Sequence, residues 1–158
     1  MLRVMDLQHY VLGTSTVSRI GFGAMQLPGP GVFGPPRDRD QAIAVLRRAA
    51  ELGVDHIDTA QYYGPDVANE LIRDALYPYP QDLALVSKVG ARRDASGGVL
   101  RYDRPDELIR GIEDNLRSLR VDRLAAVNLR LMDDARPGRA HRLHHGSGGP
   151  GVAAQPAP

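Results

Sequence analysis

The chain has 158 residues, 42% of them hydrophobic and 25% charged, which is typical of a soluble globular domain and excludes a largely disordered chain. Its formal net charge of +1 provides no strong field for nucleic acid or an anionic membrane, so we expect a small-molecule partner. The absence of cysteine excludes disulfides, thiolate catalysis and cysteine-based zinc sites. No run approaches the roughly 20 apolar residues that a membrane-spanning helix needs, and we expect a cytoplasmic protein.

The first third of the chain predicts a hairpin, a strand and a helix. Residues 10–15 and 17–20 pair as a short hairpin around a Gly-Thr-Ser turn, and the second arm continues into a short buried strand over 20–24. A loop rich in glycine and proline follows at 28–36. Residues 38–52 have apolar side chains at helical spacing, an aspartate-rich first turn and a stop at Gly53, so they predict an amphipathic helix.

The middle of the chain alternates strands and helices. The pattern predicts strands over 54–58, 83–88 and 124–130, and helices over 67–76 and 105–119. Such alternation is typical of a parallel sheet with helical crossovers, either doubly wound or closed into a (β/α) barrel. The segment Gly21-Phe-Gly-Ala-Met lacks the third glycine and the immediate helix of a dinucleotide-binding fingerprint, which favours the barrel. We predict an α/β fold, namely the first four β/α units of a (β/α)8 TIM barrel with an N-terminal β-hairpin, over residues 1–132.

Residues 133–158 differ in composition from the rest of the chain. They contain no isoleucine, aromatic residue or lysine and show no periodicity, so they predict a disordered low-complexity tail. The mixture resembles a GC-rich gene read in the wrong frame, although a natural linker of biased composition would look similar. His141, His144 and His145 suggest a metal site, but their arginine-rich surroundings and lack of carboxylates argue against one, and we predict no metal.

Charged residues end three of the predicted strands. Asp58, Lys88 and Arg130 each close a largely apolar run, and the carboxyl ends of barrel strands converge around an open mouth. If these side chains face inward, a carboxylate, an ammonium and a guanidinium meet over one pocket, with Tyr63 on the loop above. Each residue alone has a structural explanation, as a turn cap, a solvated strand end or a packing aromatic; their joint placement favours catalysis.

A tyrosine beside a lysine has a chemical use. A phenol with an unperturbed pKa of about 10 is a weak acid at neutral pH, and a nearby cation stabilises its phenolate. We therefore expect Tyr63 to serve as a general acid with Lys88 as the cation. Asp58 would hold Lys88 charged and oriented.

Four blocks of sequence resemble the aldo-keto reductase family over about residues 10–132. They are Gly21-Phe-Gly-Ala-Met, Gly53-Val-Asp-His-Ile-Asp-Thr-Ala-Gln-Tyr-Tyr-Gly, Asn69-Glu-Leu-Ile and Leu85-Val-Ser-Lys-Val-Gly. The resemblance implies NADPH-dependent reduction of an aldehyde or ketone. It matches Asp58, Tyr63 and Lys88 to the family's catalytic residues. It also implies that the nicotinamide lies over Gly23, Ala24 and Met25 and that Asp58 contacts the cofactor.

Two departures from the family pattern leave alternatives open. Arg130 stands where the family usually has histidine, and a guanidinium can donate the same hydrogen bond to a substrate carbonyl. A complete (β/α)8 barrel needs about 250 residues, and the strands whose loops bind the pyrophosphate and adenosine are missing here. Two open strand edges would predict self-association. The chain could thus be an incomplete reductase, a non-catalytic half-barrel that binds or assembles with a partner, or a frameshift product without function.

Overall fold

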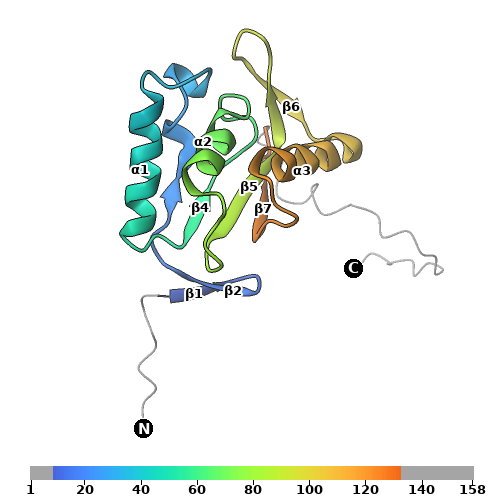
Figure 1. The fold of residues 1–158 in the computed structure, drawn as a ribbon. Helices are drawn as coiled ribbons and strands as arrows, with labels where there is room; N and C mark the ends of the chain where they lie inside the picture. The colour runs from blue at the N-terminus through green and yellow to red at the C-terminus, as the bar shows by residue number, and fades with distance from the viewer. Residues whose placement is uncertain (1–8, 133–158) are drawn as a thin grey trace, which may run out of the picture.

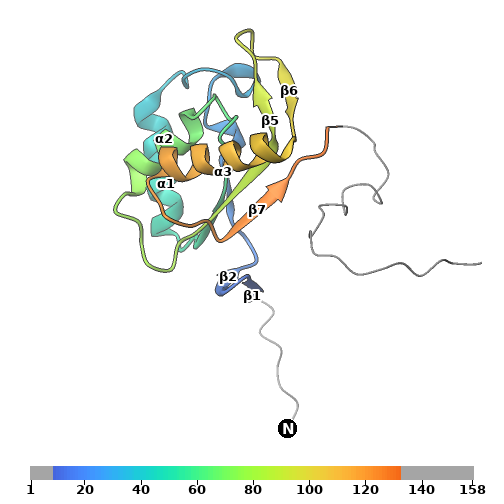
Figure 2. The ribbon, with the colours of Figure 1, turned by 90° about the vertical axis from the view of Figure 1, so that its right-hand side faces the viewer.

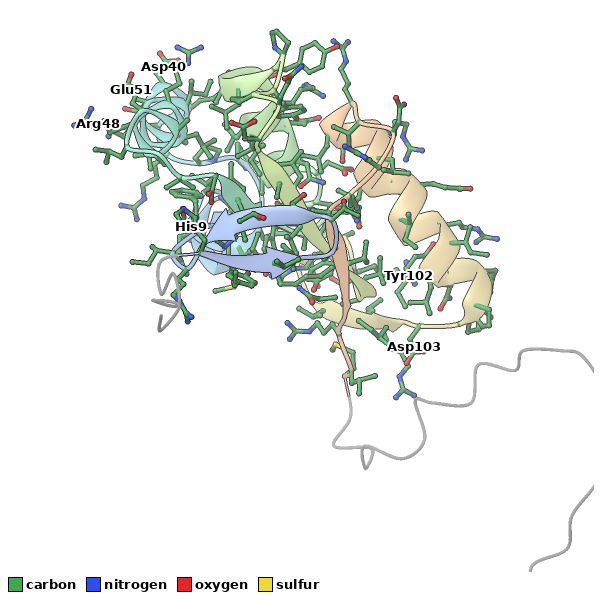
Figure 3. All side chains as sticks on the ribbon, turned by 90° about the horizontal axis from the view of Figure 1, so that it is seen from below. His9, Asp40, Arg48, Glu51, Tyr102 and Asp103 are labelled. Atoms are coloured by element: carbon green, nitrogen blue, oxygen red, sulfur yellow. The ribbon has the colours of Figure 1, made fainter. Side chains whose placement is uncertain are left out.

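The computed structural model describes residues 9–132, beginning with an antiparallel hairpin. Strands β1 (His9–Leu12) and β2 (Ser15–Ser18) pair with His9 opposite Ser18. The hairpin lies across the lower ends of the main sheet (Figures 1 and 3). Its connection to the sheet is Asp55, whose carboxylate accepts hydrogen bonds from the backbone N–H and the hydroxyl of Ser18, at 2.8 Å each for Oδ2. The predicted hairpin is confirmed, and it covers the amino-terminal end of the strands.

Four parallel strands form the main sheet in chain order. They are β3 (Phe22–Gly23), β4 (His56–Asp58), β5 (Ala84–Arg93) and β7 (Ala126–Leu129). Their register places Gly23, Asp58, Val86 and Ala126 in one row across the sheet. The outer part of β5 pairs antiparallel with β6 (Val99–Tyr102), and this hairpin projects beyond the helices (Figures 1 and 2).

Three helices provide the crossovers between these parallel strands. The helices are α1 (Arg39–Glu51), α2 (Val67–Leu76) and α3 (Pro105–Leu119), and α2 lies between the other two (Figure 1). Short 3-10 turns η1 (Ala24–Gln26) and η2 (Pro30–Val32) precede α1. The core between helices and sheet contains Leu46 of α1, Leu71 and Ile72 of α2, Ile57 of β4 and Leu119 of α3.

Local sequence explains where the helices begin and which face they bury. Asp38 caps α1 by accepting a hydrogen bond from the backbone N–H of Gln41 at 2.9 Å. Pro105 occupies the first turn of α3, a position where its missing N–H costs nothing. Gly111, Asn115 and Leu119 are buried at intervals of four residues, so one face of α3 rests on the sheet.

The structure departs from the predicted strands in two places. The first strand is only β3, and Ile20, predicted to be buried, is 81% exposed. The third strand continues to Arg93 and turns back as β6, which the sequence did not predict. This hairpin pairs with itself and is rich in arginine and glycine, so it lacks the apolar run on which the prediction depended. Gly97 lies in its turn at φ +86°, a conformation that favours glycine.

The end of the sheet at β7 is open within the described residues. Val127, Leu129 and Leu131 are 38%, 44% and 49% exposed. Figure 2 shows β7 running beside β5 with no described strand beyond it. None of the described helices is long and apolar enough to cross a membrane. The predicted tail over 133–158 lies outside the described residues.

Candidate active site

An ion pair joins the end of β4 to the middle of the neighbouring strand β5. Nζ of Lys88 lies 2.7 Å from Oδ2 of Asp58 and also donates to the backbone carbonyl of Thr59 at 3.0 Å. The lysine side chain is 19% exposed and the aspartate side chain 43%. Lys88 is the only lysine in the whole sequence; every other basic residue among the 20 is arginine. The structure thus brings together two of the three charged residues predicted to meet.

Tyr63 lies next to this ion pair. The ammonium of Lys88 is 5.0 Å from the centroid of the Tyr63 ring, within the range of a cation–π contact. Tyr63 is 6% exposed and packs edge-to-face against Tyr62, with ring centroids 5.4 Å apart. The loop that carries it is short and ordered by backbone bonds, since Tyr63 N–H donates to the carbonyl of Ala60 at 3.0 Å. Asp58, Lys88 and Tyr63 therefore form one cluster at the carboxyl end of β4, beside the middle of β5.

Two buried polar atoms of the site have no partner among the described residues. They are Oδ1 of Asp58 and the hydroxyl of Tyr62. Burial, with a smaller contribution from Tyr63, raises the pKa of Tyr62, and the positive charge of Arg130 opposes this in part. Tyr62 therefore keeps its proton at neutral pH. The carboxylate oxygen of Asp58 without a partner indicates room for a polar ligand.

Arg130 follows β7 at the rim of this cluster. Its backbone N–H donates to the carbonyl of Val89 at 2.8 Å, and its Nε lies 3.4 Å from the sulfur of Met132. Within residues 9–132 it forms no ion pair, so it does not join Lys88 and Asp58 directly. Its charge acts on Tyr62 instead.

The segment predicted to lie against a nicotinamide borders Asp58. Gly23 is the register partner of Asp58, and a Cβ built on Gly23 would meet nothing within 4 Å. Met25 is 44% exposed, but the side chain of Ala24 is fully buried in the core. A ligand above this segment could therefore touch only the backbone of Ala24.

Sequence reasoning missed Arg93, which ties three loops together near the site. Its guanidinium donates to the carbonyls of Tyr62 at 3.4 Å, Gly97 at 2.6 Å and Gly31 at 3.2 Å. Its acceptors belong to the loops after β3, β4 and β5. Arg93 belongs to no motif in the sequence and lies in a part of β5 that was not predicted, so its role could not be inferred from the sequence.

No metal centre is found in the described part of the chain, since no group of three His, Cys, Asp or Glu side chains could hold an ion there. His141, His144 and His145 lie outside the described residues.

Known proteins resemble this chain in both sequence and fold. A family model described as Aldo/keto reductase family matches residues 19–137. Over 128 residues the chain is 56% identical to a pyridoxine 4-dehydrogenase of Escherichia coli (strain K12), covering 81% of this chain and 45% of that protein. It is 32% identical over 110 residues to an L-galactose dehydrogenase of Arabidopsis thaliana, covering 67% of this chain and 32% of the relative.

Solved structures agree with these matches. A glycerol dehydrogenase from Gluconobacter oxydans aligns with a TM-score of 0.69 at 28% identity, over 84% of this chain and 42% of that one. The holo form of an aldo-keto reductase from Bacillus halodurans aligns with a TM-score of 0.63 at 31% identity, over 77% and 39%. The predicted fold class, a partial (β/α)8 barrel, is confirmed. The chain spans less than half the length of these relatives.

Proposed function

Because the chain belongs to the aldo-keto reductase family, we propose that it serves the NADPH-dependent reduction of an aldehyde or ketone in the cytoplasm. The observation that carries this proposal is the single lysine held between Asp58 and the ring of Tyr63. Tyr63 would be the general acid, and Lys88 and Asp58 the groups that prepare it.

The residues present fit a nicotinamide cofactor. Oδ1 of Asp58 is a buried acceptor without a partner, which suits a ribose hydroxyl, and the open surface over Gly23 beside it suits a flat ring. Met25 and the backbone of Ala24 would border that ring. A solved relative from Klebsiella pneumoniae, 27% identical with a TM-score of 0.53 over 74% of this chain and 37% of that one, is described in complex with NADP and acetate. The bound cofactor would supply a hydride to the carbonyl carbon.

Side chains of the site would transfer a proton to the oxygen of the substrate carbonyl. The ammonium of Lys88 is oriented by two acceptors, Asp58 Oδ2 and the Thr59 carbonyl, and stays beside the Tyr63 ring. The hydroxyl of Tyr63 would give its proton to the carbonyl oxygen, and the ammonium beside its ring would face the negative charge left on the tyrosine. Arg130, at the rim, would donate a hydrogen bond that orients the substrate.

The name of the relative from Escherichia coli suggests the first substrates to test. That protein is called a pyridoxine 4-dehydrogenase and is 56% identical to this chain over 128 residues. We propose pyridoxal, and pyridoxine in the reverse direction, as candidates beside a simple aromatic aldehyde.

The test is the loss of nicotinamide absorbance when the purified chain is mixed with NADPH and pyridoxal. Tyr63→Phe should reduce turnover by at least about 100-fold, the range expected for a general acid. Tyr62→Phe is the matched control, because it removes the neighbouring hydroxyl and should leave turnover within a few-fold. Unchanged turnover in Tyr63→Phe would contradict the assignment of Tyr63 as the general acid.

The open edge at β7 favours a second candidate, an assembly module that pairs with itself or with a longer relative. Three apolar side chains, Val127, Leu129 and Leu131, are more than a third exposed along this edge. Exposed apolar strand edges promote pairing with another chain. A sedimentation mass that rises with concentration, together with no NADPH-dependent turnover, would favour this candidate over the first.

A further inference from the structure

We propose that a buried hydrogen-bond network behind the sheet, formed by Thr59, Asn69, Ser87 and Asn115, positions the Asp58–Lys88 ion pair. The catalytic importance of this positioning rests on the proposed function. The contacts of the network do not depend on that function. All four side chains are fully buried, and apart from tyrosines no other polar or charged side chain among residues 9–132 is buried.

The network is continuous and leaves no polar group of its members without a partner. Thr59 Oγ1 donates to Asn69 Oδ1 at 2.8 Å, and Asn69 Nδ2 donates to Asn115 Oδ1 at 3.0 Å. Ser87 Oγ donates to the same Asn115 oxygen at 2.5 Å, while Asn115 Nδ2 donates to the Gly111 carbonyl at 2.7 Å. Asn69 Nδ2 also donates to the partly buried Ser118 hydroxyl at 2.9 Å. Two helices and two strands are joined in this way.

The two ends of the network are the chain neighbours of the ion pair. Thr59 directly follows Asp58, and Ser87 directly precedes Lys88. Because side chains alternate along a strand, Ser87 points to the helix face while Lys88 points to the opposite face. The network therefore holds the backbone beside each charged residue on the helix side of the sheet, while the charged groups meet on the opposite side.

Thr59 contacts both sides of the sheet. Its hydroxyl donates to Asn69 on α2, its N–H donates to the Val86 carbonyl at 2.9 Å, and its own carbonyl accepts from Lys88 Nζ at 3.0 Å. Any rotation of the Thr59 peptide would move an acceptor of the lysine. The hydroxyl bond to Asn69 opposes that rotation.

Packing alone does not require such a network. An apolar cluster of the same shape could fill this space, and buried polar groups stabilise a fold only when all of them are paired. Hydrogen bonds add direction, since each fixes the angle of the group that it holds. A network whose ends flank both members of one ion pair is suited to fixing that pair's geometry.

Because Lys88 is the only lysine, its ammonium gives a single signal in protein labelled with 15N-lysine. The experiment compares hydrogen exchange of that ammonium with water in wild type, Thr59→Val and Thr59→Ser, without cofactor or substrate. Thr59→Val keeps the shape and removes the hydroxyl; Thr59→Ser keeps the hydroxyl. We expect exchange to be about fivefold faster in Thr59→Val, the effect of losing one hydrogen bond, and near wild type in Thr59→Ser.

Tyr79→Phe is the control for a loss of stability alone. It removes one hydrogen bond, from the Tyr79 hydroxyl to the Leu119 carbonyl at 2.7 Å, at a place outside the network. If Tyr79→Phe accelerates ammonium exchange as much as Thr59→Val does, or if Thr59→Val leaves exchange unchanged while folded, the positioning role is wrong. Should Thr59→Val fail to fold, Ser87→Ala, which removes the hydroxyl at the other end of the network, should likewise accelerate the exchange, and unchanged exchange in that variant would contradict the positioning role.

The readout separates this proposal from the proposed function. Ammonium exchange reports the geometry of Lys88 whether or not the chain turns over substrate. If NADPH-dependent turnover is detected, Thr59→Val should lower kcat with little change in KM, and Thr59→Ser should restore it. Absence of turnover with the expected exchange pattern would overturn the reductase assignment and leave the network's role intact.

Discussion

Nζ of Lys88 donates a hydrogen bond of 2.7 Å to Oδ2 of Asp58, across 30 positions of sequence. The bond links the end of β4 to the middle of β5 at the point where Tyr63 packs against the ammonium, 5.0 Å from its ring centroid. The ammonium of Lys88 therefore contacts both the carboxylate of Asp58 and the ring of Tyr63. This relationship makes the lysine the residue on which the proposed chemistry most depends.

We expect Lys88→Met to abolish most of the reduction while leaving the fold in place. The substitution keeps a long unbranched side chain but removes the charge beside Tyr63, so turnover should fall by about 100-fold or more. Lys88→Arg, which keeps the charge with a different reach, should retain part of the activity. The check is the rate of NADPH oxidation, and full activity in Lys88→Met would contradict the role of the cation.

Two glycines on either side of Phe22 should respond to alanine in opposite ways. A Cβ on Gly21 would lie 2.1 Å from Nε2 of His56, a ring that is largely buried, so Gly21→Ala should destabilise the fold by about 1–3 kcal/mol. A Cβ on Gly23 meets nothing within 4 Å, and its φ of −91° suits any residue.

Gly23→Ala should therefore keep the stability within about 0.5 kcal/mol of wild type and weaken NADPH binding instead. Urea unfolding measures the first effect and cofactor titration the second. Equal stabilities for the two variants would show that the Gly21–His56 contact is not tight.

Stability should depend on pH through Asp55. Burial raises the pKa of this carboxyl, but hydrogen bonds from Ser18 and His56 outweigh it, so the net pKa lies below the usual 3.8. A lowered pKa means that the unfolded chain binds the proton more tightly, so this contribution is present above pH 3.8 and is lost as the pH falls through the folded-state value.

Ser18→Ala should lower the free energy of unfolding by about 1 kcal/mol at pH 7, because one hydrogen bond to the carboxylate is lost. The difference from wild type should shrink below pH 3.8. Urea unfolding at pH 7 and pH 3 provides the comparison, and a difference that grows in acid would reverse the assigned sign.

Arg93 should matter for turnover more than for folding. Its three carbonyl acceptors hold the loops around the site, including the backbone of Tyr62 next to Tyr63. Arg93→Ala should reduce kcat about tenfold by loosening the position of Tyr63. Arg92→Ala is a matched control, since Arg92 lies over the ring of Tyr102 on the projecting hairpin, 5.7 Å from its centroid. Equal effects of the two variants would argue against a role for the loop contacts.

Much of the fold and part of the site could be predicted from periodicity and strand ends. The helices over 67–76 and 105–119 have the predicted bounds because apolar spacing and Pro105 mark them locally. The meeting of Asp58 and Lys88 could be predicted because neighbouring parallel strands bring their carboxyl ends to one edge.

Other features depend on contacts that no local pattern records. Asn69 and Asn115 are 46 positions apart, and each alone reads as an ordinary helix residue. The β5–β6 hairpin lacks a run of alternating apolar residues, so periodicity could not reveal it. Arg130 was expected to meet Lys88 and Asp58, but it follows the exposed edge strand β7, and its charge reaches Tyr62 instead.

Titration of the purified chain with NADPH, followed by nicotinamide fluorescence, tests whether the cofactor binds beside Asp58. We expect saturable binding that weakens in Asp58→Asn and in Gly23→Ala, because both residues line the surface proposed for the nicotinamide ribose and ring. The Tyr62→Phe variant should bind as wild type does. No saturable signal at millimolar NADPH, or binding unaffected by Asp58→Asn, would contradict the assignment of the cofactor to this site.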